Sequence, residues 1–264
     1  MNKLPVIVGF GGYNAAGRSS FHHAYRRTVL HSLNADKRAN TLVSLATLMN
    51  LVAYRDGHYY DQDDAAMTAK EVAQKYQTTI EQNTLVRRIH DDYFDANNVP
   101  GLRDVELKSD EPSHFVINRK DLPNPLPDNW GVETLDDKAI KVTINGSVSV
   151  KMTSFRKLDV QSAGTLPNGF MPENEYNSRF HPRGLQLTVL GASDAINSMG
   201  IPWQTIMQSV SPDDVAVYAS SALGQTDEHG SGGYLQARLK SGRATSKQMA
   251  LGLNSMPADF INAY

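Results

Sequence analysis

Cysteine is absent from all 264 residues of the chain. Without a thiol the chain can form no disulfide bond and no thiolate metal site, and it offers no cysteine nucleophile. This absence fits a cytoplasmic protein, which is the location we expect. An excess of one charge is also missing, because 26 Lys and Arg residues face 28 Asp and Glu residues, for a formal net charge of −2. Such a balance gives no strong field for nucleic acid or an anionic membrane, so neither is an expected partner.

Long apolar runs are missing as well. No stretch approaches the roughly eighteen apolar residues that a membrane-spanning helix needs. The first ten residues hold only a short apolar run and no small-residue cleavage site, so they do not read as a signal peptide. The hydrophobic content of 40% is nevertheless enough for a sizeable core, in one large or two small domains.

Two apolar runs predict buried strands of a central sheet. Residues 4–10 (L-P-V-I-V-G-F) and residues 214–221 (D-V-A-V-Y-A-S-S) lack clear alternation, which favours strands covered on both faces. The segment Gly9–Asn14 (G-F-G-G-Y-N) partly matches a dinucleotide-binding turn. Because Asn14 occupies the position of the third glycine, a tight turn after the strand is the better interpretation.

Apolar residues at helical spacing predict three helical regions. The first covers residues 20–54 with a break near Asn34, and the third ends at Gly200. The second runs from about Ala65 through about Asp95 as one or two helices, with a break left open in the polar stretch 81–92. In the third, Leu185, Val189, Ala192 and Ile196 share one face.

Polar clusters on the first two helical regions favour solvated surface over ligand sites. His22 and His23 are neighbours in sequence, so they cannot face one metal ion from the same side of a helix. The acidic stretch 59–64 lacks the ligand spacing of a calcium loop and is better suited to a helix start. A basic cluster is interpreted as a solvated face, with a dock for an acidic carrier protein as the alternative; it contains Arg26, Arg27, Lys37 and Arg38.

The middle of the chain predicts irregular and β structure. Four prolines between Glu111 and Gly131 favour extended, irregular chain. Alternating apolar residues over 140–144 and 148–152 predict a β-hairpin, and a three-residue loop over 145–147 would place its apolar side chains on one face. Residues 155–182 are rich in Gly, Pro and Asn and predict a long loop.

The last fifty residues combine small-residue loops with short helices. Residues 227–233 (D-E-H-G-S-G-G) predict a sharp turn, a short helix is expected from Tyr234, and residues 241–246 predict a second loop. From Met256, with Pro257 in the first turn, a further helix is expected. Its apolar stripe reaches Tyr264 without a capping residue, which predicts that the natural polypeptide continues.

Several stretches resemble a known family. The segment 254–258 (N-S-M-P-A), together with residues 4–23, 179–185 and 194–202, is similar to the front half of a β-ketoacyl-acyl-carrier-protein synthase, a condensing enzyme of the thiolase superfamily. Residues 4–23 look like the long FabY-type subclass, which starts fatty-acid synthesis. The resemblance implies an α/β chain forming the amino-terminal half of a thiolase-like fold. It covers residues 1–21 and about 155–264, with an inserted helical and β-hairpin region at about 22–154.

The resemblance also implies an acyltransferase activity for a complete protein. Such an enzyme would condense a short acyl primer, an acetyl thioester, with malonyl-ACP. The family's catalytic cysteine, two histidines and lysine would lie in the following half, so we expect no catalytic residue in this chain and no activity of the chain alone. The expected partners are acyl carrier protein and acyl-CoA or acyl-ACP, with a homodimer in the complete enzyme and no cofactor or metal. The implied substrate-binding residues are Gly252, Leu253, Asn254 and Met256.

Two other functional classes remain open at this point. The loop His229–Gly233 (H-G-S-G-G) resembles the oxyanion loops of esterases, which would make the chain a hydrolase. The serine-hydrolase elbow mimic at 191–195 falls inside a predicted helix, which weighs against that class. A non-catalytic scaffold or partner subunit of a thiolase-like complex is the main alternative, since the chain lacks the nucleophile.

Overall fold

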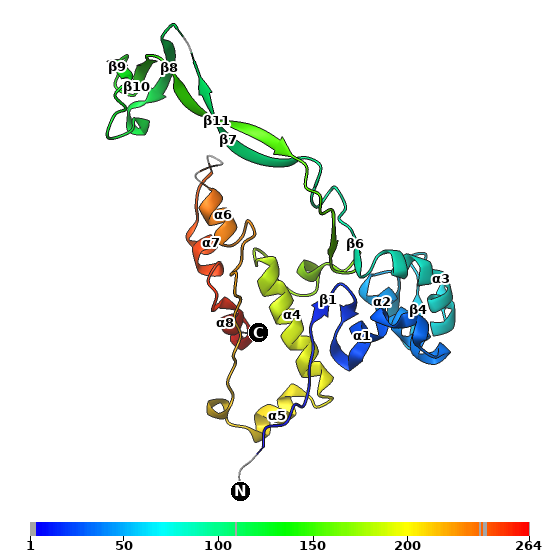
Figure 1. Cartoon of the computed structure of the whole chain (residues 1–264). Coiled ribbons are helices and arrows are strands. Elements are labelled where there is room, and N and C mark those ends of the chain that lie inside the picture. Colours follow the sequence, from blue (N-terminus) through cyan, green and yellow to red (C-terminus); the bar gives the residue numbers. More distant parts are fainter. Residues whose placement is uncertain (1–3, 109, 238, 240–241, 264) are drawn as a thin grey trace. The chain divides into compact units, whose positions relative to one another are not determined.

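We describe a computed structural model of the chain over residues 4–108, 110–237, 239 and 242–263 (Figure 1). The chain forms two compact units, each treated by itself below. Unit 1 consists of Met1–Arg88 together with Ser162–Tyr264, and unit 2 consists of Ile89–Gln161. Both helices and strands are present, which confirms the predicted α/β class.

Unit 1 is mainly helical, with short paired strands. Its first part contains β1 (Tyr13–Asn14), β2 (Gly17–Arg18), η1 (Ser20–His22), α1 (His23–Thr28), η2 (Leu30–Ser32), α2 (Ala35–Leu48), β3 (Ala53–Arg55), β4 (His58–Tyr60), β5 (Ala66–Met67), α3 (Ala69–Gln82) and β6 (Val86–Arg88). Its second part contains β12 (Ser162–Gly164), η4 (Pro172–Asn174), α4 (Arg183–Ser198), α5 (Trp203–Ser209), η5 (Pro212–Asp214), α6 (Ser231–Gln236), α7 (Ser246–Leu251) and α8 (Met256–Ala263).

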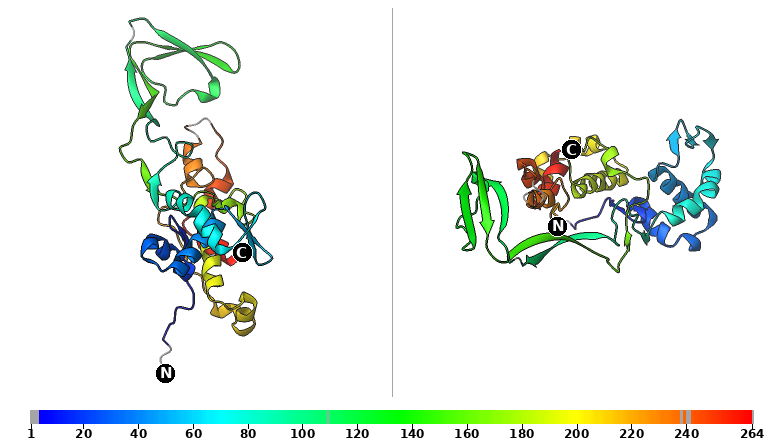
Figure 2. Two further views of the ribbon diagram at one scale, coloured as in Figure 1. Left: turned by 90° about the vertical axis from the view of Figure 1, so that its right-hand side faces the viewer. Right: turned by 90° about the horizontal axis from the view of Figure 1, so that it is seen from above.

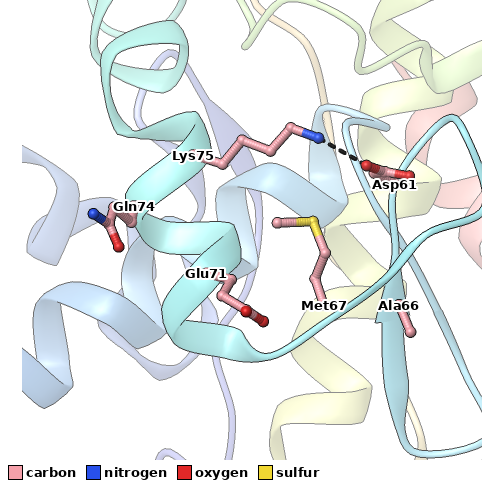
Figure 3. Close-up of a pocket in the computed structure, with 6 residues that line it drawn as sticks. All are labelled: Asp61, Ala66, Met67, Glu71, Gln74 and Lys75. Atoms are coloured by element: carbon pink, nitrogen blue, oxygen red, sulfur yellow. Dashed lines mark hydrogen bonds and ion pairs between the residues drawn. The ribbon is translucent and has the colours of Figure 1, made fainter.

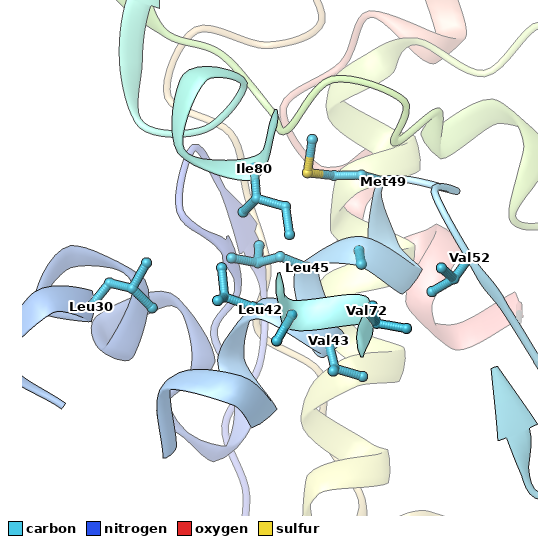
Figure 4. Close-up of a cluster of buried hydrophobic side chains, with 10 residues drawn as sticks. Leu30, Leu42, Val43, Leu45, Met49, Val52, Val72 and Ile80 are labelled. Atoms are coloured by element: carbon cyan, nitrogen blue, oxygen red, sulfur yellow. The ribbon is translucent and has the colours of Figure 1, made fainter. Parts of the chain in front are cut away.

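Helices α2 and α3 pack together around the main apolar core of unit 1. Each begins at a side-chain cap: Asn34 accepts a hydrogen bond from the Lys37 N–H, and Thr68 forms a reciprocal capping box with Glu71. Apolar side chains on the facing sides of the helices are fully buried, among them Leu42 and Ile80 (Figure 4). The predicted break near Asn34 is confirmed. The second predicted helical region, which is α3, begins at Ala69 and not at Ala65, because its N-cap residue is Thr68.

The break left open within residues 81–92 is confirmed, because α3 ends at Gln82, but the described structure has no second helix between there and Asp95. Leu85 adopts a positive φ of 64°, which no helix interior allows, and the next three residues form β6. Strand β6 pairs with β12, which lies far away in the sequence. A partner so distant leaves no trace in local periodicity. The predicted first helical region also stops early, at Leu48, and the strands β3 and β4 follow it.

Unit 2 is a β structure of two parts, seen from two further directions in Figure 2. Strands β7 (Val99–Leu107) and β11 (Val148–Arg156) form a two-stranded antiparallel ribbon. Strands β8 (Ser113–Asn118), β10 (Ala139–Ile144) and β9 (Trp130–Thr134) form an antiparallel sheet in that order, and η3 (Arg119–Asp121) follows β8. Strand β8 lies within the region predicted to be irregular, so that prediction holds only for the proline-rich residues after η3.

The predicted hairpin between 140–144 and 148–152 is wrong in its pairing. Both segments are strands, but β10 pairs with β8 and β9 while β11 pairs with β7. Ile140, Val142 and Ile144 are all buried, so the alternation identified the buried face. It could not identify the partner strands, because apolar alternation is the same for any neighbour that shares the face. A hairpin does form in this region, between β9 and β10.

The two predicted central strands are also wrong for this chain. Residues 4–10 and 215–220 form no strand in the described structure, and Ile7 and Tyr218 are 91% and 95% exposed. A strand needs a neighbour for its N–H and C=O groups, and neither stretch has a paired strand among the described residues. Both runs therefore remain extended and exposed.

Residues 10 and 11, at the end of the first of these stretches, pack closely against helix α4. A β-carbon built on Gly11 would lie 2.2 Å from the backbone nitrogen of Ala195, so no larger residue fits there. The N–H of Phe10 donates to Ser198 Oγ at 2.9 Å. Helix α4 itself was predicted correctly, with Gly200 just beyond its end.

Asp194 of α4 fastens the β1–β2 hairpin to this helix. Its carboxylate accepts hydrogen bonds from the Gly12 N–H at 3.0 Å, the Ser20 N–H at 3.2 Å and the Ser20 hydroxyl at 2.6 Å. Arg18 Nε lies 3.4 Å from the same carboxylate. Asp194 is only 4% exposed, so these contacts compensate for its lost hydration.

Candidate functional site

The four predicted substrate-binding residues lie together on the connection between α7 and α8. Gly252 follows the last residue of α7, and Met256 is the first residue of α8. Leu253 is half exposed, and the carbonyl of Asn254 accepts a hydrogen bond from the Ser221 N–H at 3.2 Å. The structure thus brings these residues onto one short segment beside the exposed 215–220 stretch.

Gly252 is required by close packing. Its φ of −79° is accessible to every residue, so the turn does not demand glycine. A β-carbon at this position would instead lie 2.8 Å from the backbone nitrogen of Ser231 and 3.0 Å from its Cβ. Helix α7 therefore contacts the start of α6 through the missing side chain of Gly252.

We expect Gly252→Ala to destabilise the chain by about 1–3 kcal/mol, because the added methyl group meets backbone that cannot move independently. Leu253→Ala is the matched control and should change stability by less than about 0.5 kcal/mol, since the Leu253 side chain is half exposed. Urea unfolding followed by circular dichroism measures both. Equal stability of the two variants would contradict this account of Gly252.

The esterase-like loop lacks the geometry of a hydrolase. Ser231 of the H-G-S-G-G segment donates its hydroxyl hydrogen to the carbonyl of Gln225 at 2.8 Å. His229 lies 3.8 Å from Glu228, and no serine–histidine hydrogen bond occurs among the described residues. The elbow mimic at 191–195 lies inside α4, as expected. In the described part of the chain no group of three or more metal-ligating side chains is found.

Three cavities in the described part of the chain are lined by residues other than the four predicted ones. Figure 3 shows one of 430 Å³, where Lys75 of α3 donates to Asp61 at 2.7 Å. Hydrogen bonds from Lys75 and from the Ala65 N–H hold the pKa of Asp61 below its usual value. A second of 330 Å³ includes Phe180 and His181, and burial lowers the pKa of His181. None of the described linings includes Gly252, Leu253, Asn254 or Met256.

The largest of these three cavities measures 600 Å³ and was not foreseen from the sequence. Its lining comes from β1, β2, α1, α2, the β3–β4 hairpin and the residue after η4. These segments are spread over more than 160 positions of the chain, from Tyr13 to Glu175. Only the packing of unit 1 brings them together. The one local indication of this cavity in the sequence was the surplus of tyrosines in the first sixty residues.

The lining of the 330 Å³ cavity includes Phe180, a residue with a strained backbone. Phe180 has a φ of 67°, and its ring lies 4.7 Å from the Arg179 guanidinium carbon and 5.3 Å from Lys247 Nζ. Cations over an aromatic face stabilise its position. The sequence stretch 179–185 contributed to the family resemblance, but these contacts could not be read from it.

The comparisons with known proteins place the chain close to the β-ketoacyl-acyl-carrier-protein synthases. No family model matches the chain. One relative among curated proteins is the β-ketoacyl-acyl-carrier-protein synthase FabY of Pseudomonas aeruginosa, which is 48% identical over 266 residues. The match covers 100% of this chain and 42% of the relative.

A solved structure gives the same result. The crystal structure of the ketosynthase FabY from Pseudomonas aeruginosa matches with a TM-score of 0.86 at 47% sequence identity, over 100% of this chain and 42% of that chain. The predicted resemblance to a FabY-type ketosynthase and the predicted fold class are confirmed. The chain therefore spans less than half the length of the relative that it matches. Among its described residues, none of the helices has the length and apolarity needed to cross a membrane.

Proposed function

We propose that this chain is the amino-terminal portion of a β-ketoacyl-ACP synthase that joins an acetyl thioester primer to malonyl-ACP and so starts fatty-acid synthesis. The observation that carries the proposal is the 48% identity to FabY over the whole chain, combined with coverage of only 42% of FabY. Acyl carrier protein and acyl-CoA or acyl-ACP are then the partners. The complete enzyme is a cytoplasmic homodimer, and residues of about 22–154 are an insertion specific to the subclass.

In this proposal the nucleophile comes from outside the chain. Condensation by covalent catalysis needs an activated group that attacks the primer thioester, and the chain contains no cysteine. The chain contributes the substrate-binding segment with Gly252, Leu253, Asn254 and Met256. It also packs against the part of the enzyme that carries the nucleophile.

The exposed apolar stretches of unit 1 support the proposal, because they are suited to pairing with strands that the described chain does not supply. Leu4, Val6, Ile7 and Val8 are each at least 64% exposed, although apolar runs of this kind favour buried strands. Further chain that pairs with residues 4–10 and 215–220 would satisfy their backbone groups and cover their side chains.

A chimera tests the proposal. The portion of Pseudomonas aeruginosa FabY that matches this chain is replaced by the chain, and formation of β-ketoacyl-ACP from an acetyl thioester and malonyl-ACP is measured. We expect turnover within about tenfold of FabY, because a matching portion at this identity preserves the packing around the reacting groups. Circular dichroism confirms that the chimera is folded.

A folded chimera without condensing activity would overturn the proposal. That result would favour the non-catalytic scaffold instead, for which the chain would need only to bind a thiolase-like partner. The same chimera carrying Leu253→Trp tests the substrate-binding segment, because a larger side chain there should slow longer primers more than acetyl.

A further inference from the structure

The cavity of 600 Å³ in unit 1 has two opposite charges in its lining. Arg18 and Glu175 both contribute to this lining, and no ion pair joins them in the described structure. The Glu175 carboxylate has no hydrogen-bond or ion-pair partner among the described residues. Opposite charges that share a cavity without pairing can each bind a group of a ligand.

The Arg18 side chain is held in place by Asp194, which contacts its Nε and leaves its terminal nitrogens available. Its Nε lies 3.4 Å from Asp194 Oδ1, and that carboxylate already accepts hydrogen bonds from Gly12 and Ser20. The terminal nitrogens of the Arg18 guanidinium have no hydrogen-bond partner among the described residues. A planar guanidinium held in this way matches the two oxygens of a carboxylate.

Tyr13 lies within electrostatic reach of both charges. Burial, followed by the nearby Asp194 charge, raises the pKa of Tyr13, while Arg18 lowers it and Glu175 raises it. The Tyr13 ring stacks on Phe170 with centroids 4.9 Å apart, which fixes its position. Its hydroxyl group is therefore a protonated hydrogen-bond donor at neutral pH.

His23 adds no charge to this lining at neutral pH. Burial, and then the positive charges of Arg18 and Arg26, lower the pKa of His23. The charges available to a ligand in the described lining are thus those of Arg18 and Glu175.

The rest of the lining combines aromatic and aliphatic side chains with four polar ones, which are Asn40, Ser44, Thr47 and Asn50. Tyr54 and Tyr59 pair across β3 and β4 with ring centroids 4.8 Å apart, and α2 contributes Val43 and Leu48. Tyrosine faces attract an ammonium group and also pack against apolar side chains. The volume falls within the range of small-molecule sites, about 300–1,000 Å³.

We infer that this cavity binds a small zwitterion, an α-amino acid with an aromatic or apolar side chain. Its carboxylate binds Arg18, its ammonium group binds Glu175, and its side chain packs against Tyr54, Tyr59 and the apolar residues of α2. The inference concerns binding alone and stands independently of the proposed condensing function.

Calorimetric titration of the 264-residue chain with L-phenylalanine tests the inference. We expect sub-millimolar binding. 3-Phenylpropanoate lacks the ammonium group and 2-phenylethylamine lacks the carboxylate. Each should therefore bind at least about tenfold more weakly than L-phenylalanine, the loss expected for one charge-assisted hydrogen bond.

Glu175→Gln is the informative variant, because it removes no hydrogen bond or ion pair of the Glu175 carboxylate to any described residue. It should weaken L-phenylalanine binding about tenfold and leave 3-phenylpropanoate binding unchanged. Glu106→Gln, an exposed position in unit 2, is the matched control and should alter neither. Absence of L-phenylalanine binding, equal binding of the three compounds, or an unchanged affinity of the Glu175→Gln variant would overturn the inference.

Discussion

Asp194→Ala will lower the free energy of unfolding of unit 1 by roughly 3 kcal/mol, a large share of the usual total of about 5–15 kcal/mol. The substitution removes the acceptor for the Gly12 N–H, the Ser20 N–H and the Ser20 hydroxyl at once. Ser20 is 1% exposed, so its freed groups cannot be hydrated without local opening. The Arg18 side chain is 39% exposed, and loss of that ion pair contributes little because water screens it.

Two measurements separate this loss from a general weakening. Urea unfolding gives the total change, and hydrogen exchange followed by mass spectrometry locates it. Peptides covering residues 10–24 should exchange faster in Asp194→Ala, while peptides covering β10 in unit 2 should be unaffected. Ser193→Ala, an exposed neighbour on the same helix, should change stability by less than about 0.5 kcal/mol. Unchanged exchange around Ser20 would show that Asp194 does not hold the hairpin.

Local signals in the sequence predicted the elements that depend on local contacts. The break near Asn34 was foreseen because a capping residue stands beside a change of periodicity, and α4 because its apolar residues recur at helical spacing up to Gly200. The buried face of β10 followed from alternation over Ile140, Val142 and Ile144. Each of these features is determined by residues within a few positions of one another.

Features that depend on distant partners could not be predicted in the same way. Strand β11 pairs with β7, whose residues lie 41 to 57 positions earlier. Strand β6 pairs with β12, and all of unit 2 lies between them in the sequence. Residues 4–10 have the pattern of a central strand but find no paired neighbour in the described chain. The apolar pattern records the environment that a segment suits, and whether that environment exists depends on other segments.

The candidate site shows the same limit. The resemblance indicated the segment from Gly252 to Met256, but the contact between Gly252 and Ser231 needed the structure. The lining of the 600 Å³ cavity carries no motif, since Arg18 and Glu175 are far apart in the sequence, with all of unit 2 between them. Asp194 was noted within a rejected hydrolase pattern and at the start of a stretch that resembles the family, but its four contacts could be seen only in the fold.

The purified chain will form no covalent acyl adduct with an acetyl thioester. The chain has no thiol, and a hydroxyl group needs an oriented base before it attacks an acyl group at a useful rate. Among the described residues, His114 Nδ1 lies 3.1 Å from the Thr143 hydroxyl, but both are in an exposed contact without a carboxylate behind the imidazole. Ser20 donates to Asp194 at 2.6 Å, yet it is 1% exposed and no thioester can reach it.

Mass spectrometry of the denatured chain after incubation with the thioester checks this expectation, with Pseudomonas aeruginosa FabY as the positive control. Acylation should be slower than that of FabY by about 10⁴-fold or more, the order of loss when a nucleophile is removed. An adduct that disappears in Thr143→Val would assign the reaction to the Thr143–His114 pair, and a stable adduct at any position would mean that the chain carries its own nucleophile. Either result would contradict the proposal that the nucleophile lies outside this chain, because the chain itself would then attack the thioester.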